Sequence, residues 1–165
     1  TGKKEDKDSS SNNNNRQDNK STLAPGTKIT DQSSKAVYKI TGKNTVEYVK
    51  CNVNKNKVSI PQKIMINGVS YQVTSIAAKA FKANKKIRSI VIPSTVRKIG
   101  KQAFLNCKNL KKITLKTSYL SKKAIGAKAF KGIHKKATIK VPKKQKKAYQ
   151  KLLKSKGVGK KVKIK

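Results

Sequence analysis

The fold of this chain is decided by three short segments of similar sequence: Ile76-Ala77-Ala78-Lys79-Ala80-Phe81, Ile99-Gly100-Lys101-Gln102-Ala103-Phe104 and Ile125-Gly126-Ala127-Lys128-Ala129-Phe130. The segments recur at an interval of about 25 residues, and a period of roughly 20 to 29 is typical of solenoids built from one strand and one turn or short helix per unit. Each segment is followed at a matching distance by an apolar pair: Ile90 and Ile92, Ile113 and Leu115, Ile139 and Val141. The pattern predicts stacked layers, with each pair on one face of a short parallel strand and one ring per layer in the centre.

The small residues of these segments fit the same interpretation. Gly100 and Gly126 allow a sharp corner where a Cβ would be costly, and Ala77 takes that place in the first copy. The alanine before each phenylalanine keeps the turn tight. We therefore expect one tight corner and one buried ring in every layer.

Two runs, residues 96–110 and 87–93, resemble the BspA-type leucine-rich repeat, whose units follow a pattern of Ile-Gly, Ala-Phe, Cys, Leu and Ile-Pro. The resemblance covers about residues 73–142 and implies a leucine-rich repeat solenoid in which Cys107 is a buried core thiol. The third copy departs from the pattern, since Ile133 replaces the cysteine and Lys136 replaces the leucine. This departure indicates a terminal unit that packs on something other than another repeat.

The N-terminal part of the chain divides into a predicted linker and predicted hairpins. Residues 1–33 are rich in Lys, Ser and Asn and have little to bury, so we expect a disordered polar linker. Residues 34–72 alternate polar and apolar side chains and contain two turn signals, residues 41–44 and the dipeptide Asn67-Gly68. These residues predict two antiparallel hairpins that cap the repeats of residues 73–142.

Residues 143–165 predict a helix and a final strand. The helix should begin after Pro142 and end at Gly157, with Tyr149 and Leu152 buried against the third repeat as a cap. A basic helix lying on an anionic membrane is the alternative, although its apolar stripe is narrow for that role. The predicted fold is therefore a mostly-β α/β solenoid, a short right-handed superhelix with a β-hairpin cap and a C-terminal capping helix.

The charge of the chain is extreme and unevenly distributed. Lys and Arg number 43 against 6 Asp and Glu, which gives a formal net charge of +37, and no acidic residue follows Glu47. Stacking should bring equivalent residues of neighbouring layers to about 5 Å. The candidate polyanion-binding surface consists of three such columns, Arg88 beside Lys111, Lys79 beside Lys128 across Gln102, and Lys85 beside Lys108 and His134.

The same distribution argues against catalysis. General acid-base chemistry and most metal sites need carboxylates, imidazoles or thiolates gathered together, whereas His134 is the only histidine and the only cysteines are Cys51 and Cys107. We therefore predict no catalytic residues, no metal site and no cofactor. Whether the two cysteines are paired is left open, and the less favoured outcome is a disulfide.

The family resemblance and the charge together predict a non-enzymatic extracellular module. Lysine-rich versions of the repeat resemble domains of surface proteins from Gram-positive gut bacteria, and the start at Thr1 suggests a mature fragment trimmed of its export signal. The expected partners are an anionic cell-wall polymer such as teichoic acid, or a host glycan or protein, bound by a monomer with no membrane span. Non-specific nucleic-acid binding is the alternative, although arginines and stacking aromatics are scarce.

Overall fold

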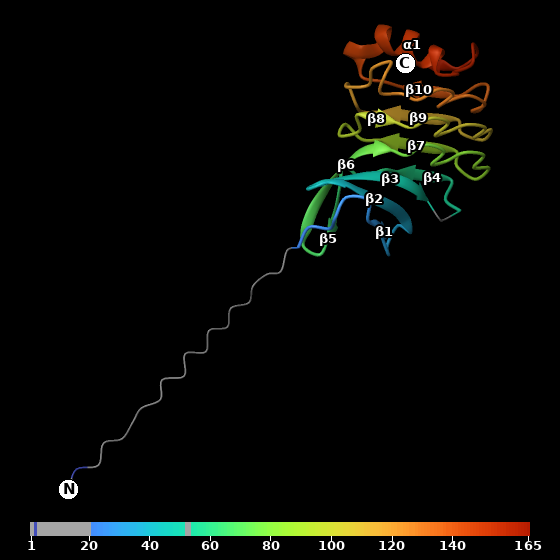
Figure 1. Ribbon diagram of the computed structural model, residues 1–165. Coiled ribbons are helices and arrows are strands. Elements are labelled where there is room, and N and C mark those ends of the chain that lie inside the picture. The colour runs from blue at the N-terminus through green and yellow to red at the C-terminus, as the bar shows by residue number, and fades with distance from the viewer. Residues whose placement is uncertain (1, 3–20, 52–53) are drawn as a thin grey trace.

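The computed structural model describes residues 2, 21–51 and 54–165. Figure 1 shows a stack in which α1 lies at one end, β10, β9 and β7 follow in turn, and β1 and β5 lie at the other end. The elements are β1 (Lys28–Thr30), β2 (Ala36–Gly42), β3 (Thr45–Cys51), β4 (Lys57–Ser59), β5 (Lys63–Ile66), β6 (Val69–Ile76), β7 (Ser89–Ile92), β8 (Lys98–Ile99), β9 (Lys112–Leu115), β10 (Thr138–Lys140), the 3-10 helix η1 (Lys143–Gln145), α1 (Lys146–Ser155) and β11 (Lys163–Ile164). The described residues are thus mostly β, with one short α-helix.

Both predicted hairpins are confirmed. β2 pairs antiparallel with β3, and β5 pairs antiparallel with β6. The second turn is made by Asn67 and Gly68, whose φ angles are 49° and 74°. These left-handed angles belong to the tight two-residue turn that suits the twist of a hairpin, and Asn and Gly adopt them at little cost.

The strands of the described residues form two sheets. The first has the order β1-β2-β3-β6-β5, with β8 added to β6, and the second has the order β11-β10-β9-β7-β4. Every pair in the second sheet is parallel, and its register places Ile90 opposite Ile113 and Ile113 opposite Ile139. The apolar pairs of the repeats therefore line one face of one sheet, as the sequence predicts.

Two strands, β1 and β4, do not fit the predicted division of the chain into linker, hairpins and repeats. β4 falls within residues 34–72 but belongs to the repeat sheet, because Val58 pairs with Ile90 in the same register as the repeat strands. β1 falls within the predicted linker, where Ile29 is half-buried and pairs with Tyr38, and the Leu23 N–H donates to the Tyr71 hydroxyl at 2.9 Å. These contacts correct the C-terminal end of the linker; its residues 3–20 lie outside the described residues.

The predicted ladder of rings is confirmed and is longer than the repeats. Phe81, Phe104 and Phe130 are buried and stack at centroid distances of 5.1 and 5.4 Å. Tyr48 of β3 continues the ladder at 5.4 Å from Phe81. The rings join the first sheet to the repeats in one hydrophobic core.

The helix α1 lies at one end of the stack, next to β10 (Figure 1). Tyr149 and Leu153 are buried, whereas Leu152 is half-exposed, so the prediction that Leu152 is buried is wrong. The Tyr149 hydroxyl donates to the Thr117 carbonyl at 2.8 Å and accepts from the Leu120 N–H at 3.1 Å. These two hydrogen bonds tie α1 to the segment from Thr117 to Leu120, and Leu153, one helical turn after Tyr149, is buried as well. The right-handed winding and the capping roles of the terminal elements stay predictions.

Candidate polyanion-binding surface

All six candidate side chains are exposed, and they fall into columns. The Lys79 N–H donates to the Lys101 carbonyl at 2.9 Å, and the Gln102 N–H donates to the Ala127 carbonyl at 3.0 Å. Lys79, Gln102 and Lys128 therefore hold equivalent positions in successive layers, with φ angles of 60°, 59° and 57°. This column follows Ile76 of β6, Ile99 of β8 and Ile125, which forms an isolated parallel bridge with Ile99.

The other candidates precede strands of the second sheet. The Lys111 N–H donates to the Arg88 carbonyl at 2.9 Å, which places these two residues in neighbouring layers. The Lys85 carbonyl accepts from the Asn109 side-chain amide at 2.8 Å, and Asn109 follows Lys108. The structure thus separates the six candidates into one group near each sheet.

A cationic cleft of about 690 Å³ gathers part of the second group. It is lined by Asn54, Lys55, Asn56, Lys57, Lys85, Lys86 and Arg88. The two sides of the cleft are joined at the Asn56 carbonyl, which accepts hydrogen bonds from the N–H groups of Arg88 at 2.7 Å and Ser89 at 3.0 Å. The Asn84 side chain accepts from the N–H groups of Lys86 and Ile87 at 2.9 and 3.0 Å. Sequence reasoning missed Lys55, Lys57 and Lys86, because the first two join the repeats only when β4 pairs with β7.

The two carboxylates of the described residues, Asp31 and Glu47, do not line this cleft and already have partners. Glu47 forms an ion pair with Lys39 at 2.7 Å. Asp31 accepts hydrogen bonds from Ser34 and Ser33, and the Ser34 side chain above all holds the pKa of that carboxyl below its usual value. Since no acidic residue follows Glu47, no side chain of the repeats can neutralise the lysines. Such a surface attracts anions and repels cations.

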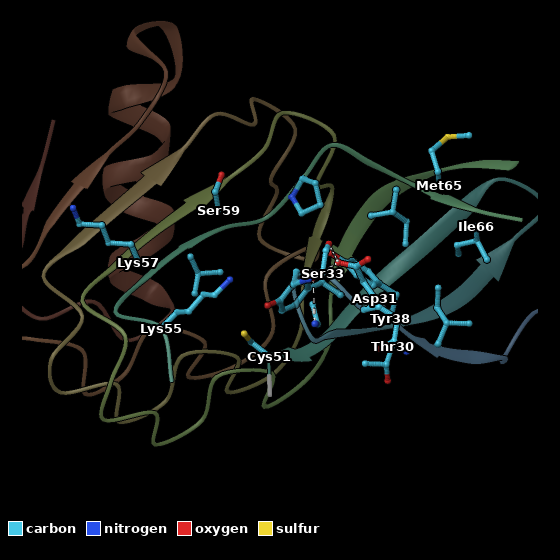
Figure 2. A pocket seen from close by; sticks show the side chains of 18 of the residues that line it. Thr30, Asp31, Ser33, Tyr38, Cys51, Lys55, Lys57, Ser59, Met65 and Ile66 are labelled. Atoms are coloured by element: carbon cyan, nitrogen blue, oxygen red, sulfur yellow. Dashed lines mark hydrogen bonds between the residues drawn. The ribbon is translucent and has the colours of Figure 1, made fainter. Parts of the chain in front are cut away.

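A larger pocket of about 940 Å³ opens beside β4, at the end of the stack opposite α1. Figure 2 shows Lys55, Lys57 and Ser59 on one side of it, Asp31, Ser33 and Tyr38 in the middle, and Met65 and Ile66 on the other side. Burial raises the pKa of the Tyr38 hydroxyl to about 12, so this group stays neutral. The pocket was missed because Ile29 and Thr30, which line it, fall within the predicted linker.

The cysteines and the single histidine take ordinary structural places. Cys107 is fully buried, its thiol lies 2.9 Å from the Phe81 carbonyl as a donor, and burial raises its pKa to about 11. Cys51 is half-exposed and forms no disulfide with Cys107. His134 is half-buried, and its Nδ1 accepts from the Lys136 N–H at 3.2 Å. Cys107 is therefore the core thiol that the resemblance implies.

The described part of the chain contains neither a cluster of metal-ligating side chains nor a membrane-spanning helix. No group of three or more His, Cys, Asp and Glu side chains there could hold a metal ion. None of the helices described has the length and apolarity that crossing a bilayer requires.

Comparison with known proteins gives a family and a fold. The family model described as the BspA type leucine rich repeat region matches residues 74–164 in six copies. A leucine rich cell surface protein from Faecalibacterium prausnitzii is 26% identical with a TM-score of 0.58, over 71% of this chain and 37% of that one. A leucine-rich repeat protein from Bacteroides capillosus is 19% identical with a TM-score of 0.57, over 84% of this chain and 98% of that one. No curated protein matches the chain.

Proposed function

Because the chain belongs to the BspA-type leucine-rich repeat family, we propose that it is a non-catalytic binding or adhesion module displayed at a bacterial cell surface. The similarity to a protein described as a leucine rich cell surface protein supports this location. The stacked repeats support the role, because they build an extended and rigid surface on which side chains can be arranged for a partner.

The partner of this module is an anionic polymer, such as wall teichoic acid or an acidic glycan. The observation that carries the proposal is the absence of any acidic residue after Glu47, which leaves every exposed lysine of the repeats available to an anion. Lys79, Lys85, Arg88, Lys108, Lys111 and Lys128 are all exposed and contribute to the attraction. Like charges in columns also repel one another, and a bound polyanion relieves that repulsion.

A binding screen of the intact chain tests this function. Purified wall teichoic acid, acidic and neutral glycans, and host surface proteins are immobilised, and binding is measured at low and at physiological salt. We expect binding to anionic polymers that weakens as salt rises, with no binding to neutral glycans. Binding only to proteins, with no salt dependence, would replace the polymer with a protein partner.

Non-specific nucleic-acid binding is the second candidate, because a net charge of +37 attracts phosphates as well. Only three arginines are present, whereas base recognition depends strongly on arginine. Among the described residues, Tyr119 carries the one exposed aromatic ring. The guanidinium carbon of Arg97 already lies 4.3 Å from the centroid of that ring. Duplex DNA in the same screen separates the two candidates, since tighter binding to DNA than to every wall polymer or glycan favours the second.

A further inference from the structure

The exposed face of the second sheet carries lysines on alternate strands. The register aligns one residue from each strand, in the order β4, β7, β9, β10 and β11: Lys57, Ser89, Lys112, Thr138 and Lys163. The residues that follow Ser89 and Lys112, Ile90 and Ile113, are buried in the core. Because successive strand residues point to opposite faces, the aligned set, here named the lysine column, faces outward.

The spacing of the lysine column follows from the sheet. Neighbouring strands lie about 4.8 Å apart, so lysines on alternate strands are rooted roughly 10 Å apart. The three lysines are exposed, and the intervening Ser89 and Thr138 are half-exposed. A hydroxyl donates one hydrogen bond and can also accept hydrogen bonds, whereas an ammonium only donates. The column therefore offers a cation and a neutral hydrogen-bonding group in alternation.

The lysine column runs into the cationic cleft at its β4 end. Lys57 belongs to both, and the cleft adds Lys55, Lys85, Lys86 and Arg88. Among these, Arg88 presents a planar fork that binds a carboxylate or sulfate with two bonds, whereas each lysine acts as a point charge. The cleft is thus suited to hold an anionic group more firmly than a single lysine of the column.

We propose that an acidic polysaccharide in which charged and neutral sugars alternate binds along the lysine column, across the strands, with one charged unit in the cationic cleft. The ammonium groups of Lys57, Lys112 and Lys163 contact the charged sugars, and the hydroxyls of Ser89 and Thr138 contact the neutral ones. This inference rests on the proposed function and names its ligand class and its face. Lys79 and Lys128 lie near the first sheet and are not part of the lysine column.

Two charge-matched triple variants test the proposal. The column variant carries Lys57→Gln, Lys112→Gln and Lys163→Gln, and the control variant carries Lys98→Gln, Lys101→Gln and Lys123→Gln, three exposed lysines associated with the first sheet. The probe is a labelled oligosaccharide of alternating glucuronate and N-acetylglucosamine, and its Kd is measured by fluorescence anisotropy at one salt concentration. We expect the column variant to weaken binding about tenfold or more, and the control variant to weaken it by about threefold or less.

Each remaining outcome has a definite meaning. Equal weakening by both variants overturns the lysine column while the proposed function stands, because the wild-type chain still binds. Failure of the wild-type chain to bind any polyanion at low salt overturns both. Column-dependent binding of poly(glycerol phosphate), without column-dependent binding of the oligosaccharide, overturns the ligand class. Thermal melts check the folding of each variant, and a column variant with three Lys→Arg substitutions should retain binding, which separates loss of charge from loss of structure.

Discussion

The rings of Phe81 and Phe104 stack in parallel, with centroids 5.1 Å apart and planes 9° from parallel. Phe104 is fully buried between Phe81 and Phe130, so Phe104→Ala removes a ring and leaves a cavity in the middle of the core. We expect a loss of about 3 to 5 kcal/mol in the free energy of unfolding, measured by urea denaturation.

The control for this variant is Met65→Ala, because the Met65 side chain is 64% exposed. It should change the stability by no more than about 0.5 kcal/mol. A loss under about 1 kcal/mol for Phe104→Ala would contradict the ladder as the core of the repeats.

Gly100 lies against the backbone of the neighbouring layer. A Cβ added there would stand 2.2 Å from the Ala78 backbone nitrogen, a distance that no side-chain movement can relieve. We expect Gly100→Ala to lower the melting temperature clearly, with a cost of about 1 to 3 kcal/mol or more. Gly159 has nothing within 4 Å of the same added atom, and Gly159→Ala is the matched control. Equal melting temperatures for the two variants would show that the layers pack less closely than described.

The repeats were predictable from sequence to a greater extent than the elements before them. The Phe81, Phe104 and Phe130 ladder and the Ile pairs recur with their spacing, so the stacking of layers was visible in one dimension. Tyr48 continues the ladder of rings, and Val58 lies in the sheet of the repeat strands. No repeated motif surrounds either residue, so only the contacts of β3 and β4 with the repeats reveal their place.

The candidate site shows the same limit. Columns within the repeats, such as Arg88 and Lys111, follow from the repeat alignment and are confirmed as neighbours by a backbone hydrogen bond. The cationic cleft joins the repeats to residues 54–57, which lie outside the repeat motif, so no periodicity could predict it. Leu152 was assigned to the core because helical spacing cannot choose between two adjacent leucines; the buried one is Leu153, one helical turn after Tyr149.

Leu153 tests the role of α1. Leu153→Asp places a charge in a fully buried position, and we expect it to destabilise the whole stack by about 3 kcal/mol or more. Leu152→Asp, at a half-exposed position, should cost markedly less. Unfolding is followed by circular dichroism. If both variants keep full stability and lose binding to anionic vesicles, α1 is a membrane-surface element and not a cap.

Cys107 gives the stability a dependence on alkaline pH. Burial raises the pKa of its thiol from 9.0 to about 11, so the folded state disfavours the thiolate that forms readily in the unfolded chain. The contribution of the protonated thiol to the free energy of unfolding is fully present below pH 9 and is lost as the pH rises through 11. The loss is roughly 1.4 kcal/mol for each pH unit between the two pKa values.

The measurement is the difference in unfolding free energy between wild type and Cys107→Ala. Other titrating groups, lysines and tyrosines included, affect both proteins alike and cancel in this difference. We expect any advantage of the wild type at pH 8 to shrink by up to about 3 kcal/mol at pH 11, or to become a disadvantage. A difference that stays constant over this range would show that the thiol is accessible to water in the folded state.

On the function proposed above, the acid-free cationic surface of the repeats binds an anionic polymer. The most direct test is the Kd of the intact chain for the tightest polymer of the screen, measured as a function of NaCl concentration. Release of about three counterions predicts that log Kd rises linearly with log salt and that binding weakens by roughly 50-fold between about 50 and 200 mM. A Kd that stays within about twofold over that range would contradict electrostatic recognition by this surface.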